Sequence, residues 1–196
     1  MRWENLFDDL ESQLEQGLSA EEVDLRAEEE RLRLGRLVLR DRLIALHAVG
    51  SDIQLVLAND RHLVIRPIAF GRDWMSGTLV EQTRRHPQCI LPIAAIAALI
   101  LPRDLVAASI EMTGSADDRT PKLSERLGLP FVLRDLCRRR SSVQITTRLA
   151  AHHGTIDRVG RDHLDLAVHA TNDARRESAV TQYRVVPFDQ VLLLQM

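Results

Sequence analysis

The chain has 196 residues, with 26 basic and 28 acidic side chains and a formal net charge of −2. That length accommodates one or two domains, and 45% hydrophobic residues suffice for a sizeable core. The slightly negative charge excludes attraction of the whole molecule to nucleic acid, so any such site has to be a local patch. The basic residues are nearly all arginine, with Lys122 the only lysine, which we attribute to a GC-rich genome.

Cysteine usage and the N-terminus indicate the compartment. Cys89 and Cys137 stand far apart, which is neither a disulfide framework nor a zinc pattern and fits a reducing environment. The N-terminus turns acidic at Glu4, unlike a signal peptide. The longest apolar run, Cys89–Leu101, contains Pro92 and falls short of the roughly 20 residues that span a bilayer. We therefore expect a cytoplasmic protein without membrane contact.

The first predicted element is an acidic helical arm over residues 1–35. Apolar side chains recur three and four residues apart, which gives a stripe along a helix, while the opposite face is acidic. The stripe packs on its own protein or a second copy, or docks into the groove of a protein partner. Its members are Trp3, Leu6, Phe7, Leu10 and Leu14.

A second helix is predicted to follow Gly17. Ser19-Ala20-Glu21-Glu22 has the form of a capping box, which starts a helix. The helical pattern continues towards Val49-Gly50, with a break indicated at Gly35.

The periodicity then changes to that of strands. Ile53, Leu55 and Leu57 alternate with their neighbours, and short β runs separated by polar turns continue to Pro92, which ends a strand because it lacks a donor. Residues 102–120 are predicted to form a linker. Thr120-Pro121 then opens another helix, which reaches Arg138–Arg140.

An internal repeat decides the domain organisation. Several segments of the first copy recur in the same order in the second, including a lead-in helix with the same Leu-Arg-Asp string. The matched pairs are Leu39–Asp41 with Leu133–Asp135, Ser51–Leu55 with Ser141–Ile145, Gly71–Met75 with Gly160–Leu164, and Ile90–Ile93 with Val185–Phe188.

We predict an α+β protein with two Sm-like or SH3-like small β-barrels, each preceded by a helix, after the N-terminal arm. The first barrel with its helix covers residues 36–101 and the second 121–196. In each copy the apolar-Pro-apolar step is predicted to stop one strand, form a short 3₁₀ turn and release the final strand, Val191–Leu194 in the second copy. Closure of such barrels protects strand edges.

The second copy resembles the first Sm motif. Val143–Thr147 followed by Gly154-Thr155-Ile156 resembles the family's strand, short turn and bending glycine, and Gly160–Leu166 resembles the loop and strand with which Sm proteins hold a base. The whole chain also resembles double-barrel proteins of high-GC actinobacteria. The resemblance implies the Sm-like fold and a base site near His163.

The chain departs from the Sm pattern at the base site. The family's base-binding asparagine falls at Asp165 in the second copy and at Ser76 in the first. Its Arg-Gly or Lys-Gly step is replaced by Pro187-Phe188-Asp189 and Pro92-Ile93-Ala94, and Val64 or Ile65 stands at the bending glycine of the first copy. A shared fold does not carry function with it.

No residue cluster has the pattern of a catalytic or metal site. His152-His153 is predicted to lie in a hairpin turn, and no cysteine accompanies it or His163 and His169. The acidic residues Asp157, Asp162 and Asp165 lack a nucleophile–base pair, and glycine loops that cradle phosphates are absent. We therefore expect no enzymatic activity, no metal and no cofactor.

Basic residues support an alternative function. The arginine triplet at residues 138–140 either contacts phosphates or forms a solvated helix C-terminus. A nucleic-acid site, RNA or DNA, would draw on the triplet, the second-copy loop and the segment after it: Arg138, Arg139, Arg140, Arg161, His163, Asp165, Arg175 and Arg176. Our leading expectation is a non-catalytic scaffold that acts through protein–protein interaction or self-association, and the alternative is an Sm-like nucleic-acid-binding regulator.

Overall fold

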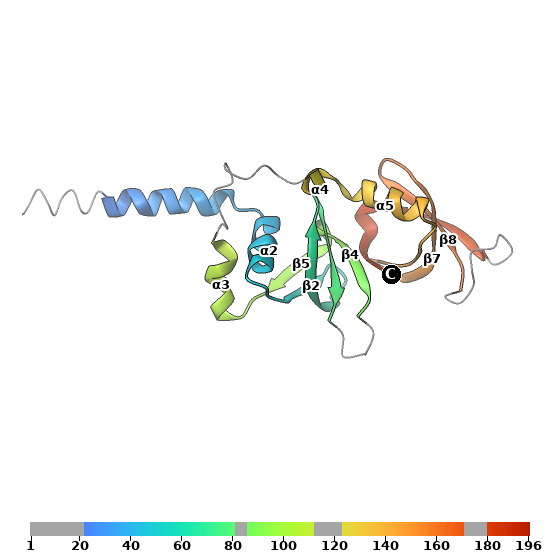
Figure 1. The fold of residues 1–196 in the computed structure, drawn as a ribbon, viewed down its shortest axis with the longest axis horizontal. Helices are drawn as coiled ribbons and strands as arrows, with labels where there is room; N and C mark the ends of the chain where they lie inside the picture. The colour runs from blue at the N-terminus through green and yellow to red at the C-terminus, as the bar shows by residue number, and fades with distance from the viewer. Residues whose placement is uncertain (1–21, 81–85, 112–122, 171–179) are drawn as a thin grey trace, which may run out of the picture. The chain divides into compact units, whose positions relative to one another are not determined.

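The computed structural model describes residues 22–80, 86–111, 123–170 and 180–196, and the chain divides into two compact units, 1–38 and 39–196 (Figure 1). In the first unit, residues 22–36 form a helix. Ion pairs Glu22–Arg26, Glu28–Arg31 and Glu30–Arg33 link successive turns of this helix. The predicted stripe between Trp3 and Leu14 lies outside the described residues.

The second unit begins with what we call the first half, residues 39–110. It has a helix, four strands, a 3₁₀ turn, a fifth strand and a closing helix. In order these are α2 (Leu39–Ala48), β1 (Ile53–Leu57), β2 (His62–Phe70), β3 (Trp74–Leu79), β4 (Gln88–Pro92), η1 (Ile93–Ala95), β5 (Ile96–Ile100) and α3 (Arg103–Ile110).

The second half, residues 123–196, follows the same plan without a closing helix. Its elements are α4 (Leu123–Arg126), α5 (Leu129–Arg138), β6 (Ser142–Thr147), β7 (Ala151–Val159), β8 (His163–Val168), β9 (Gln182–Pro187), η3 (Phe188–Gln190) and β10 (Val191–Gln195). The α+β class predicted from sequence is confirmed.

The strands of the described residues join in one antiparallel sheet with the order β5-β1-β2-β3-β4-β10-β6-β7-β8-β9. The order within the first half, β5-β1-β2-β3-β4, is repeated as β10-β6-β7-β8-β9. The halves meet where β4 pairs with β10, with Ile90 opposite Leu194 and Cys89 opposite Gln195. The sheet therefore ends in two edge strands, β5 and β9.

The predicted proline step is confirmed in both halves. Strands β4 and β9 end at Pro92 and Pro187, each is followed by a three-residue 3₁₀ turn, and the final strand starts directly after it. Proline stops the ladder because it has no N–H to donate, and its fixed φ suits the turn that follows.

The helices differ from the sequence prediction in three respects. The buried leucines Leu43 and Leu46 of α2 correspond to Leu133 and Leu136 of α5. The predicted match of Leu39–Asp41 with Leu133–Asp135 was therefore wrong by one helical turn. The helix expected to run through to residue 140 is broken at residues 127–128. The segment expected to be a linker contains α3, which packs on α2 through hydrogen bonds from Arg42 to Ser109 Oγ, the shorter at 2.8 Å.

Two hydrophobic cores meet at the junction strand β10. Leu192 and Leu193 belong to the core of the first half, whereas Val191 and Leu194 belong to the core of the second. In exchange, Trp74 and Ile90 of the first half pack in the second core. Each core is therefore completed by side chains of the other half.

Each half has one glycine where neighbouring strands approach closely. A Cβ on Gly154 of β7 would lie 2.2 Å from Ala167 O on β8, and one on Gly77 of β3 would lie 2.5 Å from Arg66 O on β2. The first half thus keeps a close approach through a glycine on β3, whereas Val64 or Ile65 stands on β2 at the position that the sequence comparison gave to the bending glycine.

Replacing Gly154 by alanine should lower the free energy of unfolding by about 1–3 kcal/mol, because the added methyl group forces the two backbones apart. Chemical denaturation followed by tryptophan fluorescence measures the loss. The matched control is Gly35→Ala in helix 22–36, where a Cβ meets nothing within 4 Å and alanine is the better helix former. Equal stability of Gly154→Ala and the unsubstituted chain would contradict the close approach.

Candidate interaction surfaces

A loop of the first half grips the start of α5. Arg72 N and Trp74 Nε1 both donate to Leu127 O at 3.0 Å. Leu129 N donates to Asp73 Oδ1 at 2.7 Å, so this carboxylate satisfies a donor that the helix start leaves free. The Gly71–Trp74 loop therefore holds the two-residue break before α5.

The Gly160–His163 loop of the second half closes with the same backbone hydrogen bond. Gly160 N donates to His163 O at 2.9 Å, as Gly71 N donates to Trp74 O at 2.8 Å. In both loops the aromatic ring lies over the glycine, where a Cβ would come within 3 Å of the ring. This explains why the Gly-Arg-Asp string recurs.

A cavity of about 550 Å³ lies between the two loops. Its polar lining combines arginine and aspartate from both halves, and its apolar lining comes from α5, the end of β9 and η3. The lining residues are Arg72, Asp73, Leu129, Pro130, Arg161, Asp162, Pro187, Phe188 and Asp189. The mixture of charges gives the cavity no single sign.

The two edge strands expose side chains whose counterparts at the β4·β10 junction are buried. Ile90 in β4 is 4% exposed, whereas Val185, at the matching position of β9, is 66% exposed. All of Val191–Leu194 in β10 is buried, but the matching stretch of β5 is half-buried or exposed. Tyr183 on β9 is also exposed. Unpaired strand edges with apolar side chains are templates for pairing with another chain.

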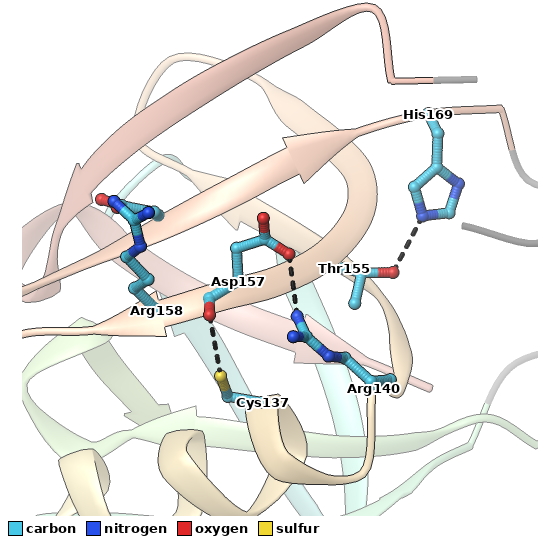
Figure 2. A network of polar contacts seen from close by, with 7 residues as sticks. Cys137, Arg140, Thr155, Asp157, Arg158 and His169 are labelled. Carbon is cyan, nitrogen blue, oxygen red and sulfur yellow. Dashed lines mark hydrogen bonds and ion pairs between the residues drawn. The ribbon is translucent and has the colours of Figure 1, made fainter. Parts of the chain in front are cut away.

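The predicted arginine triplet is held by carboxylates. Arg138 and Arg139 both bond to Asp135, at 2.5 and 2.7 Å, and Arg140 reaches Asp157 at 3.0 Å (Figure 2). These exposed ion pairs are weak, but they offset the positive potential that a phosphate would meet.

The other residues of the nucleic-acid alternative are not brought together with the triplet by any contact in the described part of the chain. Asp165 lies 3.9 Å from Arg158, and His163 Nδ1 bonds to Asp162 Oδ1 at 2.8 Å. Arg161 is exposed on the cavity. Arg175 and Arg176 lie outside the described residues.

The histidine pair is not in a turn, as was predicted, but within β7. His152 Nε2 accepts from Arg184 on β9 at 3.0 Å, and His153 Nε2 shares a 2.8 Å hydrogen bond with Ser142 Oγ. His153 also meets the buried His169 ring edge to face, with centroids 5.4 Å apart. The two side chains point to opposite faces of the sheet, as alternation along a strand requires.

Buried His169 completes this polar cluster. Its Nδ1 donates to Ala170 O at 3.0 Å, and its Nε2 shares a 2.9 Å bond with Thr155 Oγ1, the contact drawn in Figure 2. Burial and the nearby His169 lower the pKa of His153, and burial and Arg184 lower that of His152. The described residues contain no group of three or more side chains able to hold a metal ion.

The cysteines have structural contacts. Burial raises the pKa of the Cys89 thiol to about 11, which leaves little reactive thiolate. Cys137 Sγ donates to Asp157 O at 3.2 Å, between α5 and β7 (Figure 2). Among the described helices, none is long and apolar enough to cross a membrane.

The described residues define the chain as an α+β protein whose sheet repeats a five-stranded order and ends in the strands β5 and β9. Comparison with protein-family models, with curated proteins and with solved structures finds no match.

Sequence reasoning singled out Arg161 and His163 but missed the gripping residues Asp73 and Leu129. The signal was present in the repeated Gly-Arg-Asp string, since an aspartate two residues after a glycine in both copies suits a turn that caps a helix. The helix that Asp73 caps lies 56 positions further along the chain, so no local pattern identifies it.

Acidification should destabilise the fold in part through His153. The fold lowers the pKa of His153 from its ordinary value of 6.5. The free energy of unfolding is therefore highest above pH 6.5, and it falls as the pH drops through the lowered pKa. Denaturant unfolding measured between pH 7 and pH 5 should show this loss as a slope of the free energy of unfolding against pH. His153→Gln should reduce that slope. His62→Gln, an exposed histidine of β2, serves as control and should keep the slope. An unchanged slope in His153→Gln would contradict the assignment.

Proposed function

We propose that this protein is a non-catalytic scaffold that self-associates head to tail through its free sheet edges. Each half is, in this proposal, a small barrel of the Sm-like kind, supported by the leading helix, the repeated strand order and the 3₁₀ turn before the last strand. One observation carries the proposal. The β4·β10 junction pairs the fourth strand of one half with the fifth of the other, and the free edges are another fourth and fifth strand.

The backbone of β9 presents its hydrogen-bonding groups to solvent at Tyr183 and Val185. Phe188 N donates to Asp162 O at 2.8 Å, so Phe188 faces β8. The backbone N–H and C=O groups of successive residues in a strand point to opposite sides. Those of Val185, three residues before Phe188, therefore point away from β8. Val185 thus corresponds in direction as well as in position to Ile90, which faces β10.

The backbone of β5 is oriented to accept this strand. Met196 N donates to Gln88 O at 3.0 Å, so Leu194, two residues earlier, also faces β4. Leu99 occupies the matching place in β5, because both strands have five residues and follow a 3₁₀ turn. We infer the antiparallel register Leu99 opposite Val185 and Leu101 opposite Tyr183 between two copies.

The charges of the described residues favour self-association over the nucleic-acid alternative. The arginine triplet is offset by Asp135 and Asp157, whereas β5 is uncharged and β9 contributes Arg184 alone. An uncharged edge that exposes apolar side chains suits a protein strand better than a phosphate backbone.

Val185→Pro should abolish self-association while leaving the monomer folded. Proline removes the N–H that faces the free edge but no bond to β8, and proline is tolerated on an edge strand in this position. Size-exclusion chromatography with light scattering over a range of concentrations measures the mass.

The matched control is Val185→Thr, which keeps the N–H and a β-branched side chain and should associate like the unsubstituted chain. Circular dichroism verifies that both variants are folded. A monomeric unsubstituted chain at every concentration, or association of Val185→Pro equal to that of Val185→Thr, would reject the proposal. Such a result would turn attention to salt-dependent binding of RNA or DNA.

A further inference from the structure

The internal junction contains a second contact besides the paired strands. The Gly71–Trp74 loop lies in the same half as β4, and the break before α5, which the loop grips, lies in the same half as β10. Strand pairing and loop grip therefore belong to one junction. A junction of the same kind between two copies would bring together the Gly160–His163 loop and a matching break before a helix.

In the part of the chain that the structure describes, a second break of this kind precedes α2. Helix 22–36 ends, residues 37–38 are not helical, and α2 starts at Leu39; likewise α4 ends, residues 127–128 are not helical, and α5 starts at Leu129. Helices α2 and α5 each have 10 residues, and both are followed by a turn and the first strand of their half. Leu37-Val38-Leu39 therefore matches Leu127-Gly128-Leu129.

We propose that the Gly160–His163 loop of one copy binds the Leu37–Leu39 segment of a second copy. Leu39 N donates to Asp162 Oδ1, as Leu129 N does to Asp73 Oδ1, and Arg161 N donates to Leu37 O, as Arg72 N does to Leu127 O. The proposal rests on the head-to-tail association proposed above and assigns its second point of contact.

The binding loop has its groups in place. Asp162 has an 86% exposed side chain, and its carboxylate bonds to the neighbouring His163 ring. That hydrogen bond lowers the pKa of Asp162, so the carboxylate is charged and a strong acceptor for a helix N–H. Phe188 N donates to Asp162 O at 2.8 Å, as Ile93 N does to Asp73 O at 3.0 Å, which fixes both loops alike.

Two substitutions make the intermolecular grip weaker than the internal one. In the first loop the Trp74 indole donates to Leu127 O, whereas in the second loop His163 Nδ1 already donates to Asp162. The intermolecular contact therefore lacks the bond that corresponds to that of Trp74. Val38 replaces Gly128, at which a Cβ would meet the end of the Arg72 side chain at 2.8 Å. The corresponding Arg161 side chain is exposed and moves aside at little cost.

Charge-matched variants test the grip. Asp162→Ala should weaken self-association roughly tenfold, the effect of losing a hydrogen bond to a charged group. Asp162→Asn keeps an acceptor but loses the charge, so its association constant should lie between those of Asp162→Ala and the unsubstituted chain. The control Asp189→Ala removes the same charge from the same cavity and should leave the association constant unchanged. Analytical ultracentrifugation measures the constants, and circular dichroism confirms folding.

His163→Trp supplies a test in the opposite direction. It restores the indole donor of the first loop over a glycine that already accommodates a ring, and should tighten association by roughly three- to tenfold. If the unsubstituted chain associates but Asp162→Ala equals Asp189→Ala and His163→Trp brings no gain, the loop contact is rejected and strand pairing stands. If the unsubstituted chain is monomeric, the scaffold proposal itself fails.

Discussion

The pairing of β4 with β10 is the constraint on which the second unit depends. A strand edge that is buried must have its N–H and C=O groups paired, and here each half supplies the other's partner strand. Because Leu192 and Leu193 complete the first core while Trp74 and Ile90 enter the second, separating the halves would expose apolar surface as well as two edges. The halves therefore fold as parts of one unit, in agreement with the compact unit at residues 39–196.

The same constraint explains why duplicated elements differ in composition. The last strand of the second half is Val-Leu-Leu-Leu, all buried, whereas its counterpart in the first half is Ile-Ala-Ala-Leu, half-buried or exposed. Small side chains on an open edge reduce the apolar area shown to solvent, and Arg184 places a charge on the opposite edge.

Much of the fold was predictable because its signals are local. Pro92 and Pro187 fix strand ends by chemistry alone, and the repeated strings indicate that the elements of one half recur in the other. The lead-in helices were misaligned by one turn because a helix keeps a similar apolar face when shifted by four residues. Only the burial of Leu43 and Leu133 against their sheets distinguishes the two registers. His152 and His153 were assigned to a turn because the true turn lacks glycine, asparagine and proline.

The turn that joins β6 to β7 shows why the sequence pattern did not locate every turn. Thr147 closes it with its side chain, accepting from Leu149 N and Ala150 N at 3.3 and 3.2 Å. A hydroxyl does this job more weakly than asparagine or aspartate and leaves little mark on the sequence. The contact between the Gly71–Trp74 loop and the start of α5 was equally hidden, because Asp73 and Leu129 lie 56 positions apart in the chain and belong to different halves.

The proposed head-to-tail pairing has a geometric consequence. In such pairing each copy would add one edge strand of each kind, so the interface would be heterologous, and the rotation relating successive halves would decide between a closed ring and an open filament. Strand pairing alone leaves that rotation loosely set, since sheet twist varies widely between neighbouring strands. A second contact, such as the loop on the helix start, would narrow that rotation, because the loop and the helix start meet only over a limited range of angles. At the internal junction the Asp73–Leu129 bond has this effect on β4 and β10.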